Sequence, residues 1–108
     1  MADHSKTHAR RYVRAVGPFK GYHLGLRKTP VLIFNLNVGG GFVNFPDEQP
    51  IATTFVLTIE LPEEGRVTAL AQIVYRDPSG LGVRFVDLEP DDSERLKRAV
   101  ERAVAEGA

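Results

Sequence analysis

Two short clusters of polar residues in the first 40 positions have the types and spacing to bind a planar, anionic ligand. The first is the run Arg10-Arg11-Tyr12-Val13-Arg14, in which Arg10 and Arg14 form an Arg-x-x-x-Arg pattern. A guanidinium group is a planar fork of hydrogen-bond donors, so it can bind phosphate oxygens or the O6/N7 edge of guanine. Arg11 adds a third cation, whose role the pattern leaves open.

The second cluster is the run Asn35-Leu36-Asn37-Val38-Gly39-Gly40. Asn35 and Asn37 are two residues apart, so in a strand they point to one face. Their side-chain amides can donate and accept hydrogen bonds together, which suits the edge of a base. Glycine at position 40 would let a ligand approach the backbone closely.

The other reactive residue types do not converge on a catalytic or metal site. Adjacent carboxylates occur only in expected loops or a helix start, at Asp47-Glu48, Glu63-Glu64 and Asp91-Asp92. Sequence neighbours do not converge on one substrate bond, so acid–base catalysis has little support. His4 and His8 could share a helical face, but nothing else near them completes a metal site. The chain has no cysteine, which excludes disulfides and thiolate chemistry. We therefore expect no enzyme activity, no catalytic residue, no metal and no cofactor.

Length and composition place both clusters in one small domain. The chain has 108 residues, and close to three in ten are Val, Leu, Ile or Phe, which argues against disorder. It contains no apolar run near the roughly 18 residues of a membrane span and no signal-peptide core, so we expect a cytoplasmic protein. Net charge is zero, but residues 1–28 carry +6 and residues 29–108 carry −6. A basic arm on an acidic body suits phosphate, nucleotide or nucleic acid, although the charge pattern alone slightly favours a solvated, self-shielding tail.

Alternating strands must position the two clusters. An apolar run at 31–34 leads into the Asn cluster, and 42–45 is expected to return beside it. Residues 54–61 and 66–76 alternate most clearly, and the second run puts Tyr75 on the same face as Ile73. A turn at 77–80 leads to a last strand, whereas residues 10–30 predict an irregular arm or short strand pieces. Many short strands with short loops indicate an antiparallel sheet or small barrel.

The C-terminal sequence changes to a helical period. One helical stripe is formed by Leu96, Ala99, Val100, Ala103 and Val104. Asp91 and Glu94 can form a capping box, and Gly107 would end the helix. We expect this helix to cover an open end or a seam of the barrel. The expected organisation is a flexible tail over 1–9 and one domain over 10–108, with an arginine-bearing arm at 10–30, a barrel at 31–88 and a helix at 91–105.

These features together resemble the PilZ domain, a bacterial receptor module for the second messenger cyclic di-GMP. That family combines Arg-x-x-x-Arg with a later [Asp/Asn]-x-Ser-x-x-Gly at a strand end. This chain has Arg10 and Arg14, then the run from Asn35 to Gly40, and its ending Gly80–Leu88 resembles the family's last strand. The resemblance covers roughly residues 10–104. It implies a mainly all-β fold, a small antiparallel six-stranded β-barrel with one C-terminal α-helix.

The resemblance also implies a nucleotide-binding receptor and adaptor without enzyme activity. Arg10 and Arg14 would contact the phosphates and the guanine Hoogsteen edges of cyclic di-GMP, with Arg11 beside them. Asn35 and Asn37 would hold a base from the barrel face. Gly40 would permit its close approach. Binding would move the N-terminal arm, and an unidentified downstream protein would read the change. We expect a monomer or weak homodimer and no nucleic-acid polymer as partner.

One position departs from the family pattern, because Asn37 stands where the family has Ser. Its longer side chain could crowd the guanine or replace the hydroxyl contact. One alternative is therefore a degenerate PilZ-like protein-interaction module that does not bind cyclic di-GMP. Another is a general nucleic-acid binder that uses the basic arm and stacks bases on Tyr12, Phe19 and Tyr22, against which the acidic body argues.

Overall fold

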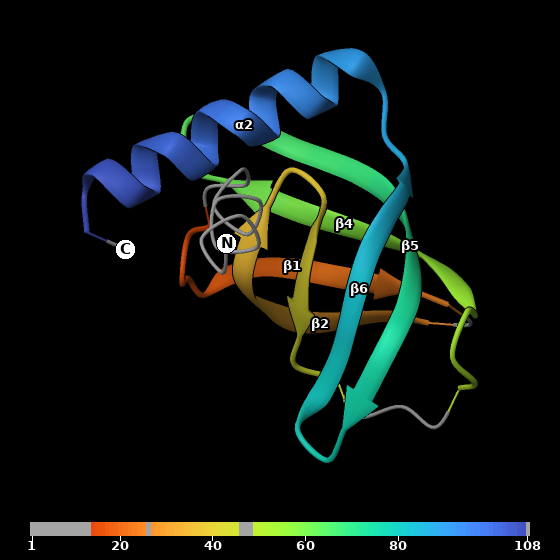
Figure 1. The fold of residues 1–108 in the computed structure, drawn as a ribbon. Coiled ribbons are helices and arrows are strands. Elements are labelled where there is room, and N and C mark those ends of the chain that lie inside the picture. The colour runs from red at the N-terminus through yellow and green to blue at the C-terminus, as the bar shows by residue number, and fades with distance from the viewer. Residues whose placement is uncertain (1–13, 26, 46–48, 108) are drawn as a thin grey trace, which may run out of the picture.

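The computed structural model describes residues 14–25, 27–45 and 49–107, which form six strands and one helix. The elements are β1 (Phe19–Leu24), β2 (Lys28–Asn37), β3 (Gly40–Val43), β4 (Thr54–Leu61), β5 (Gly65–Asp77), β6 (Gly80–Asp87) and α2 (Pro90–Ala105). The strands close into an antiparallel barrel in the order β1-β2-β3-β6-β5-β4 (Figure 1). The expected all-β barrel with a C-terminal helix is confirmed.

The alternation of apolar and polar residues explains how the barrel forms. From Phe55 to Leu61 in β4 and from Val67 to Ile73 in β5, every second side chain is apolar and buried. The hairpin pairs the two strands in register from Thr54 opposite Gln72 to Leu61 opposite Gly65. Burying these apolar faces against one another provides the main driving force of folding. The fully buried large side chains that fill the interior are Ile33, Leu36, Leu57, Ile59, Ile73, Leu81, Leu96, Val43, Val67 and Val100.

The barrel begins earlier in the sequence than expected. Residues 19–24, placed in the arm by the sequence pattern, form strand β1, which pairs with both β2 and β4. Strand β2 likewise starts at Lys28 rather than at position 31. Gly21 obscures the alternation of β1, because it resembles a turn residue. Its role is close packing instead, since a Cβ there would lie 2.4 Å from the Thr58 carbonyl oxygen and 2.6 Å from Ile33 Cδ1.

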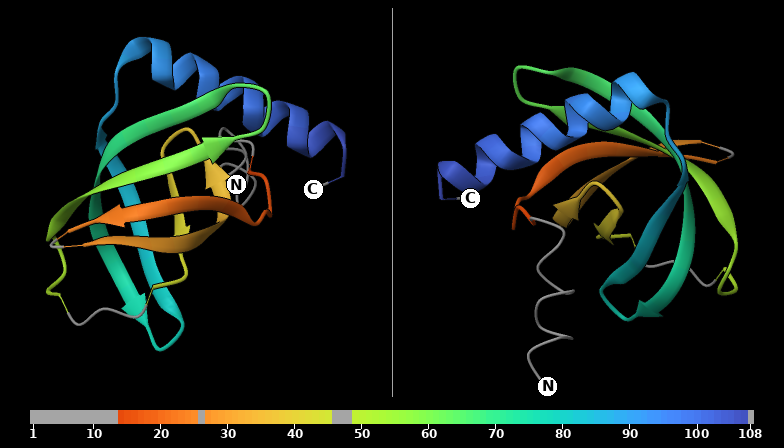
Figure 2. Two further views of the ribbon diagram at one scale, coloured as in Figure 1. Left: turned by 180° about the vertical axis from the view of Figure 1, so that it is seen from behind. Right: turned by 45° about the horizontal axis from the view of Figure 1, so that its top comes forward.

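Helix α2 lies across one end of the barrel (Figure 2). It buries Leu96, Ala99 and Val100 against that end, as the helical stripe predicts. The expected capping box is wrong. The helix begins at Pro90, where the missing N–H costs nothing, and the preceding Glu89 makes no side-chain cap hydrogen bond. In the part of the chain that the structure describes, no helix has the length and apolarity needed to cross a bilayer.

Charged groups on the β4–β5 turn hold α2 in place. The carboxylate of Glu64 accepts hydrogen bonds from Arg98 at 3.0 Å and from Arg102 at 3.1 Å. Arg95 donates to the Glu64 carbonyl oxygen at 2.7 Å. The Arg98 hydrogen bond, followed by that of Arg102, lowers the pKa of Glu64. The position of α2 across the barrel end therefore depends on an ion-pair network as well as on apolar burial.

Candidate ligand-binding site

A short antiparallel bridge brings the two polar clusters of the sequence together. The amide of Ala15 donates to the carbonyl oxygen of Leu36, and the amide of Leu36 donates to that of Ala15, both at 2.9 Å. In an antiparallel pair, the residue before one partner lies opposite the residue after the other. Arg14 is therefore placed beside Asn37, although the two residues are 23 positions apart in the sequence.

An irregularity in β2 positions the two asparagines. The register shifts between Phe34 and Asn37, and Asn35 adopts a left-handed backbone conformation with φ of 53°. Asparagine tolerates this conformation better than most residues. The Asn35 amide donates to the Val16 carbonyl oxygen at 3.0 Å. Beyond the irregularity alternation resumes, so Leu36 is fully buried while Asn35 and Asn37 lie on the outer side.

The β2–β3 turn is fixed by the side chain of Asn37. Its Oδ1 accepts a hydrogen bond from the Gly39 amide at 2.6 Å, an Asx-type turn contact. The Gly39 carbonyl oxygen in turn accepts a hydrogen bond from the Phe85 amide of β6 at 2.8 Å. Gly40 has no room for a side chain, since a Cβ would lie 2.1 Å from the Val83 carbonyl oxygen. The oxygen of Asn37 therefore holds the turn, and its amide nitrogen remains a donor.

These residues line a surface hollow of about 370 Å³. Four of the six site residues expected from the sequence border it, namely Arg14, Asn35, Asn37 and Gly40. The other two, Arg10 and Arg11, lie outside the described residues. The rest of the lining consists of Gly39, Gly41, Phe42, Val74, Tyr75, Gly82 and Val83. The lining thus combines polar residues, several glycines and an apolar group, which we call the apolar wall.

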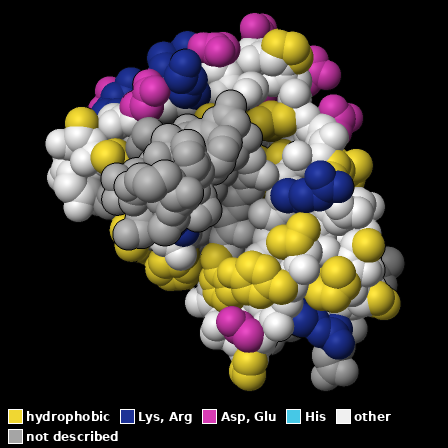
Figure 3. Space-filling view, in the orientation of Figure 1, with side chains coloured by type: hydrophobic (Ala, Val, Ile, Leu, Met, Phe, Trp, Pro, Cys, Tyr) yellow, Lys and Arg dark blue, Asp and Glu magenta, His cyan; other side chains and the backbone are white. Residues whose placement is uncertain are grey.

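The sequence pattern does not reveal the apolar wall. Strict alternation places Tyr75 on the inner face with Ile73, but the β5–β6 register shifts between these two residues. Val74 and Tyr75 consequently both face outward, and 43% and 52% of their surface is exposed. Hydrophobic side chains gather over the lower part of β3 and β6 in Figure 3. The one sequence feature that could have indicated this register shift is Gly82, which pairs with Tyr75, since a glycine inside a strand often marks a bulge.

The β5–β6 turn holds the end of the strand that carries this wall. Oδ1 of Asp77 accepts hydrogen bonds from the Ser79 hydroxyl at 2.7 Å, the Ser79 amide at 2.8 Å and the Gly80 amide at 3.1 Å. The hydroxyl of Ser79 contributes most to lowering the pKa of Asp77. The hydrogen bonds that close the turn therefore favour the charged form of this carboxylate.

The chemistry of the hollow suits binding rather than bond making. The side chains that line it offer a guanidinium group, two amides and two aromatic rings. A guanidinium and amides match anionic oxygens and base edges, whereas aromatic rings match the face of a base. Within residues 14–25, 27–45 and 49–107, no three His, Asp or Glu side chains gather as metal ligands.

Solved structures with a similar fold come from bacterial proteins. One is the Bacillus subtilis inhibitor of motility MotI/DgrA, with a TM-score of 0.77 and 20% identity over 90% of this chain and 52% of that chain. Another is the PilZ domain of Escherichia coli YcgR with cyclic di-GMP, with a TM-score of 0.67 and 18% identity over 91% of this chain and 95% of that one. The chain thus spans about half of the MotI/DgrA chain.

YcgR of Escherichia coli in complex with cyclic di-GMP is also similar, with a TM-score of 0.72 and 20% identity over 91% of this chain and 47% of that chain. No curated protein sequence matches the chain. The sequence model of the PilZ domain matches residues 6–102, which includes both polar clusters and all the strands. The chain therefore belongs to the PilZ domain family.

Proposed function

We propose that this chain is a receptor for cyclic di-GMP that passes the signal to a partner protein. The observation that supports it most is the meeting of Arg14 and Asn37 at one hollow, from two clusters that are distant in sequence. Membership of the PilZ family supports the same ligand, because YcgR, a similar structure, is solved with cyclic di-GMP.

In this proposal the ligand is held between the N-terminal arm and the barrel, an arrangement that we call the clamp. The guanidinium of Arg14 contacts a phosphate or the O6/N7 edge of guanine, as do Arg10 and Arg11 from the N-terminal arm. Asn35 and Asn37 contribute amide groups from the barrel, and Gly40 leaves the backbone open to the base. Ligand binding changes the conformation of the N-terminal arm, and a downstream protein reads this change. The protein acts by binding alone, and no bond of the ligand is broken.

Asn37 is compatible with this role although the family pattern has Ser. Its Oδ1 already bonds the Gly39 amide at 2.6 Å, a local contact that a serine hydroxyl can also make. The amide nitrogen of Asn37 then supplies a donor, which matches a phosphate oxygen or guanine O6 and N7.

Calorimetric titration of the purified chain with cyclic di-GMP tests the proposal, with GTP and cyclic di-AMP as comparison ligands. We expect selective binding with one or two ligands per chain. Arg14→Ala removes a charge-assisted contact worth about 1.5–3 kcal/mol, so we expect the affinity to fall about 10- to 150-fold. Arg10→Ala should act in the same direction.

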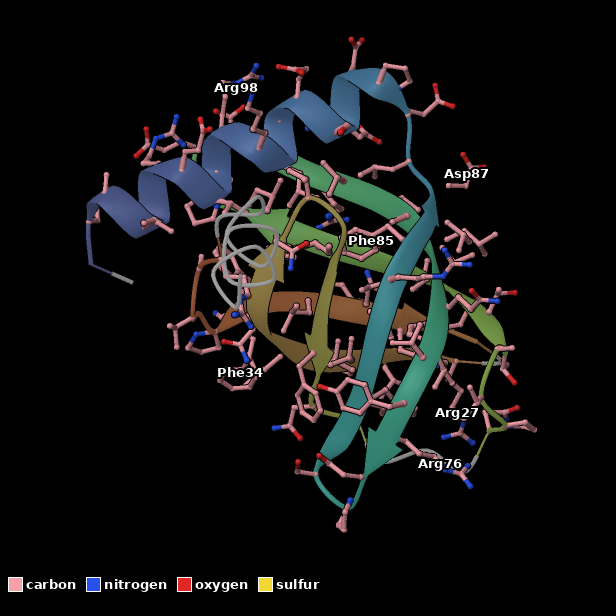
Figure 4. The ribbon with its side chains drawn as sticks, viewed as in Figure 1. Arg27, Phe34, Arg76, Phe85, Asp87 and Arg98 are labelled. Carbon is pink, nitrogen blue, oxygen red and sulfur yellow. The ribbon has the colours of Figure 1, made fainter. Side chains whose placement is uncertain are left out.

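Arg27→Ala is the matched control. Arg27 is an exposed arginine toward the end of the barrel remote from α2 (Figure 4), and it is not part of the hollow. Equal losses of cyclic di-GMP affinity for Arg14→Ala and Arg27→Ala would indicate a non-specific effect of charge. Wild-type binding by both Arg14→Ala and Arg10→Ala would refute the clamp.

A protein-interaction module without a nucleotide ligand is the second candidate, and the Asn37 substitution is the observation that favours it. It predicts no heat and no thermal stabilisation at saturating cyclic di-GMP. A nucleic-acid binder would instead bind unrelated oligonucleotides with strong dependence on salt.

A further inference from the structure

We propose that Tyr75 and Phe42 form a stacking wall for a guanine base, and that Tyr75 is a specificity-determining residue of the site. The inference rests on the proposed function, but it assigns a role to residues outside both polar clusters. It follows from the position, exposure and packing of the two rings.

The two rings approach each other from different strands. Phe42 lies on β3 and Tyr75 near the end of β5, and their ring centroids are 6.2 Å apart with planes tilted by 31°. Both line the hollow together with Val74. Tyr75 is exposed and Phe42 is half-buried beside it, so the pair offers apolar area in a concave site that a flat ligand can cover, and bases stack on such rings.

Gly82 keeps the Tyr75 ring in position. A Cβ at residue 82 would lie 2.1, 2.4 and 2.5 Å from the Cε2, Cζ and Cδ2 atoms of Tyr75. The ring therefore rests directly on the backbone of β6, in space that only a glycine leaves free. Tyr75 is nevertheless 52% exposed, so the ring is supported from one side and accessible from the other.

The polar residues that line the same hollow explain why a guanine fits best. Arg14 and the amide nitrogen of Asn37 are donors. Guanine presents two acceptors, O6 and N7, on its Hoogsteen edge, whereas adenine presents a donor at N6 beside N7. A guanine stacked on the two rings can thus turn its acceptors O6 and N7 toward the donors of Arg14 and Asn37. An adenine in the same place would turn its N6 donor toward these protein donors.

Tyr75→Ala tests the inference by calorimetry with cyclic di-GMP and cyclic di-AMP. Loss of one stacked base costs about 1–3 kcal/mol, so we expect cyclic di-GMP to bind about 5- to 150-fold more weakly. Selectivity over cyclic di-AMP should fall as well, because the base is no longer held in one orientation. Tyr75→Phe keeps the ring and should bind within about 3-fold of wild type. Tyr22→Ala, an aromatic truncation on β1 outside the hollow, is the matched control and should leave affinity unchanged.

Tyrosine fluorescence gives a second readout. The chain has no Trp and three Tyr, so a variant with Tyr12→Phe and Tyr22→Phe leaves Tyr75 as the only such emitter. Cyclic di-GMP should quench its emission in step with binding. If wild type binds cyclic di-GMP but Tyr75→Ala binds it equally well, the stacking role of Tyr75 is refuted, whereas the proposal that the chain is a cyclic di-GMP receptor is supported. If folded wild-type protein binds no cyclic di-GMP, both the proposed function and the stacking role of Tyr75 are refuted.

Discussion

Gly82→Ala should weaken ligand binding without unfolding the barrel. Neither glycine nor alanine has a side chain that can form a hydrogen bond, so the effect must come from the space that the new methyl group takes. The three atoms nearest to a Cβ at this position all belong to the Tyr75 ring, the closest at 2.1 Å. Ordinary van der Waals contact begins at 3.4 Å, so the ring must move by about 1.3 Å. Because this ring is the exposed end of a side chain, it can rotate away rather than strain the backbone.

The expected magnitudes separate stability from affinity. A displaced side chain costs of order 0.5–1.5 kcal/mol, which is a small part of the roughly 5–15 kcal/mol that stabilises a domain of this size. Losing the stacking surface costs about 1–3 kcal/mol of binding free energy, or roughly 5- to 150-fold in affinity. The variant should therefore stay folded and bind cyclic di-GMP nearly as weakly as Tyr75→Ala.

A double-mutant cycle measures whether Gly82 acts through the ring. The dissociation constants of wild type, Gly82→Ala, Tyr75→Ala and the double variant are determined by calorimetry, with circular dichroism to verify folding. Once residue 75 is alanine, the new methyl group meets no ring, so the double variant should bind like Tyr75→Ala alone. The two losses are then strongly non-additive. Additive losses, or wild-type affinity for Gly82→Ala, would refute the reasoning.

Three further variants test the site and the fold. Asn37→Asp keeps an oxygen for the Gly39 amide but removes the donor and adds a negative charge, so calorimetry should show at least a 10-fold loss of cyclic di-GMP affinity, whereas Asn37→Ser should stay within about 10-fold of wild type. Glu64→Gln should lower the thermal midpoint at pH 7 and flatten its decline in acid. Because the pKa of Glu64 is lowered from its ordinary 4.5, its stabilising contribution is complete above that pH and is lost as the pH falls toward the folded-state value. Leu96→Ala removes a fully buried contact of α2, and urea denaturation should show a loss of about 2–5 kcal/mol.

Each of these variants has an outcome that contradicts its premise. Equal affinity for Asn37→Asp and wild type would mean that the amide nitrogen does not reach the ligand. Glu60→Gln is the control for Glu64, since Glu60 forms its 3.4 Å pair with the exposed Arg66 of β5 and not with an arginine of α2. The same acid profile for both variants would show that the Glu64 network does not stabilise the docked helix. A loss below about 1 kcal/mol for Leu96→Ala would mean that the helix contributes little to the barrel.

Features with a regular repeat could be predicted from the sequence. The alternation in β4, the alternation in β5 as far as Ile73, and the helical stripe through Leu96, Ala99 and Val100 appear in the structure as expected. The two polar clusters also identify four residues that line one hollow. Pairing over a long separation, such as Ala15 with Leu36, has no local signature. That this pairing brings the two polar clusters to one site could be inferred only from the family resemblance.

Features that depend on a local break in a repeat could not be predicted. The register shift before Tyr75 reverses the direction in which that side chain points, so alternation assigns it to the wrong face. Gly21 is likewise indistinguishable from a turn residue until Thr58 and Ile33 are seen packed against its α-carbon. The helix start depends on the conformation of Glu89 and Pro90, which the acidic run after them conceals.

The closed order of the six strands restricts how a partner protein can be recruited. Every strand of the barrel has neighbours on both sides, so the part of the chain that the structure describes offers no sheet edge for another chain to extend. Recruitment by β-strand addition, which relies on unpaired backbone amides and carbonyls, is thereby unavailable to the barrel. Under the proposed function, a downstream protein would have to recognise side chains instead. Its specificity would then depend on the shape and charge of the surface, which a ligand can change without breaking any strand pairing.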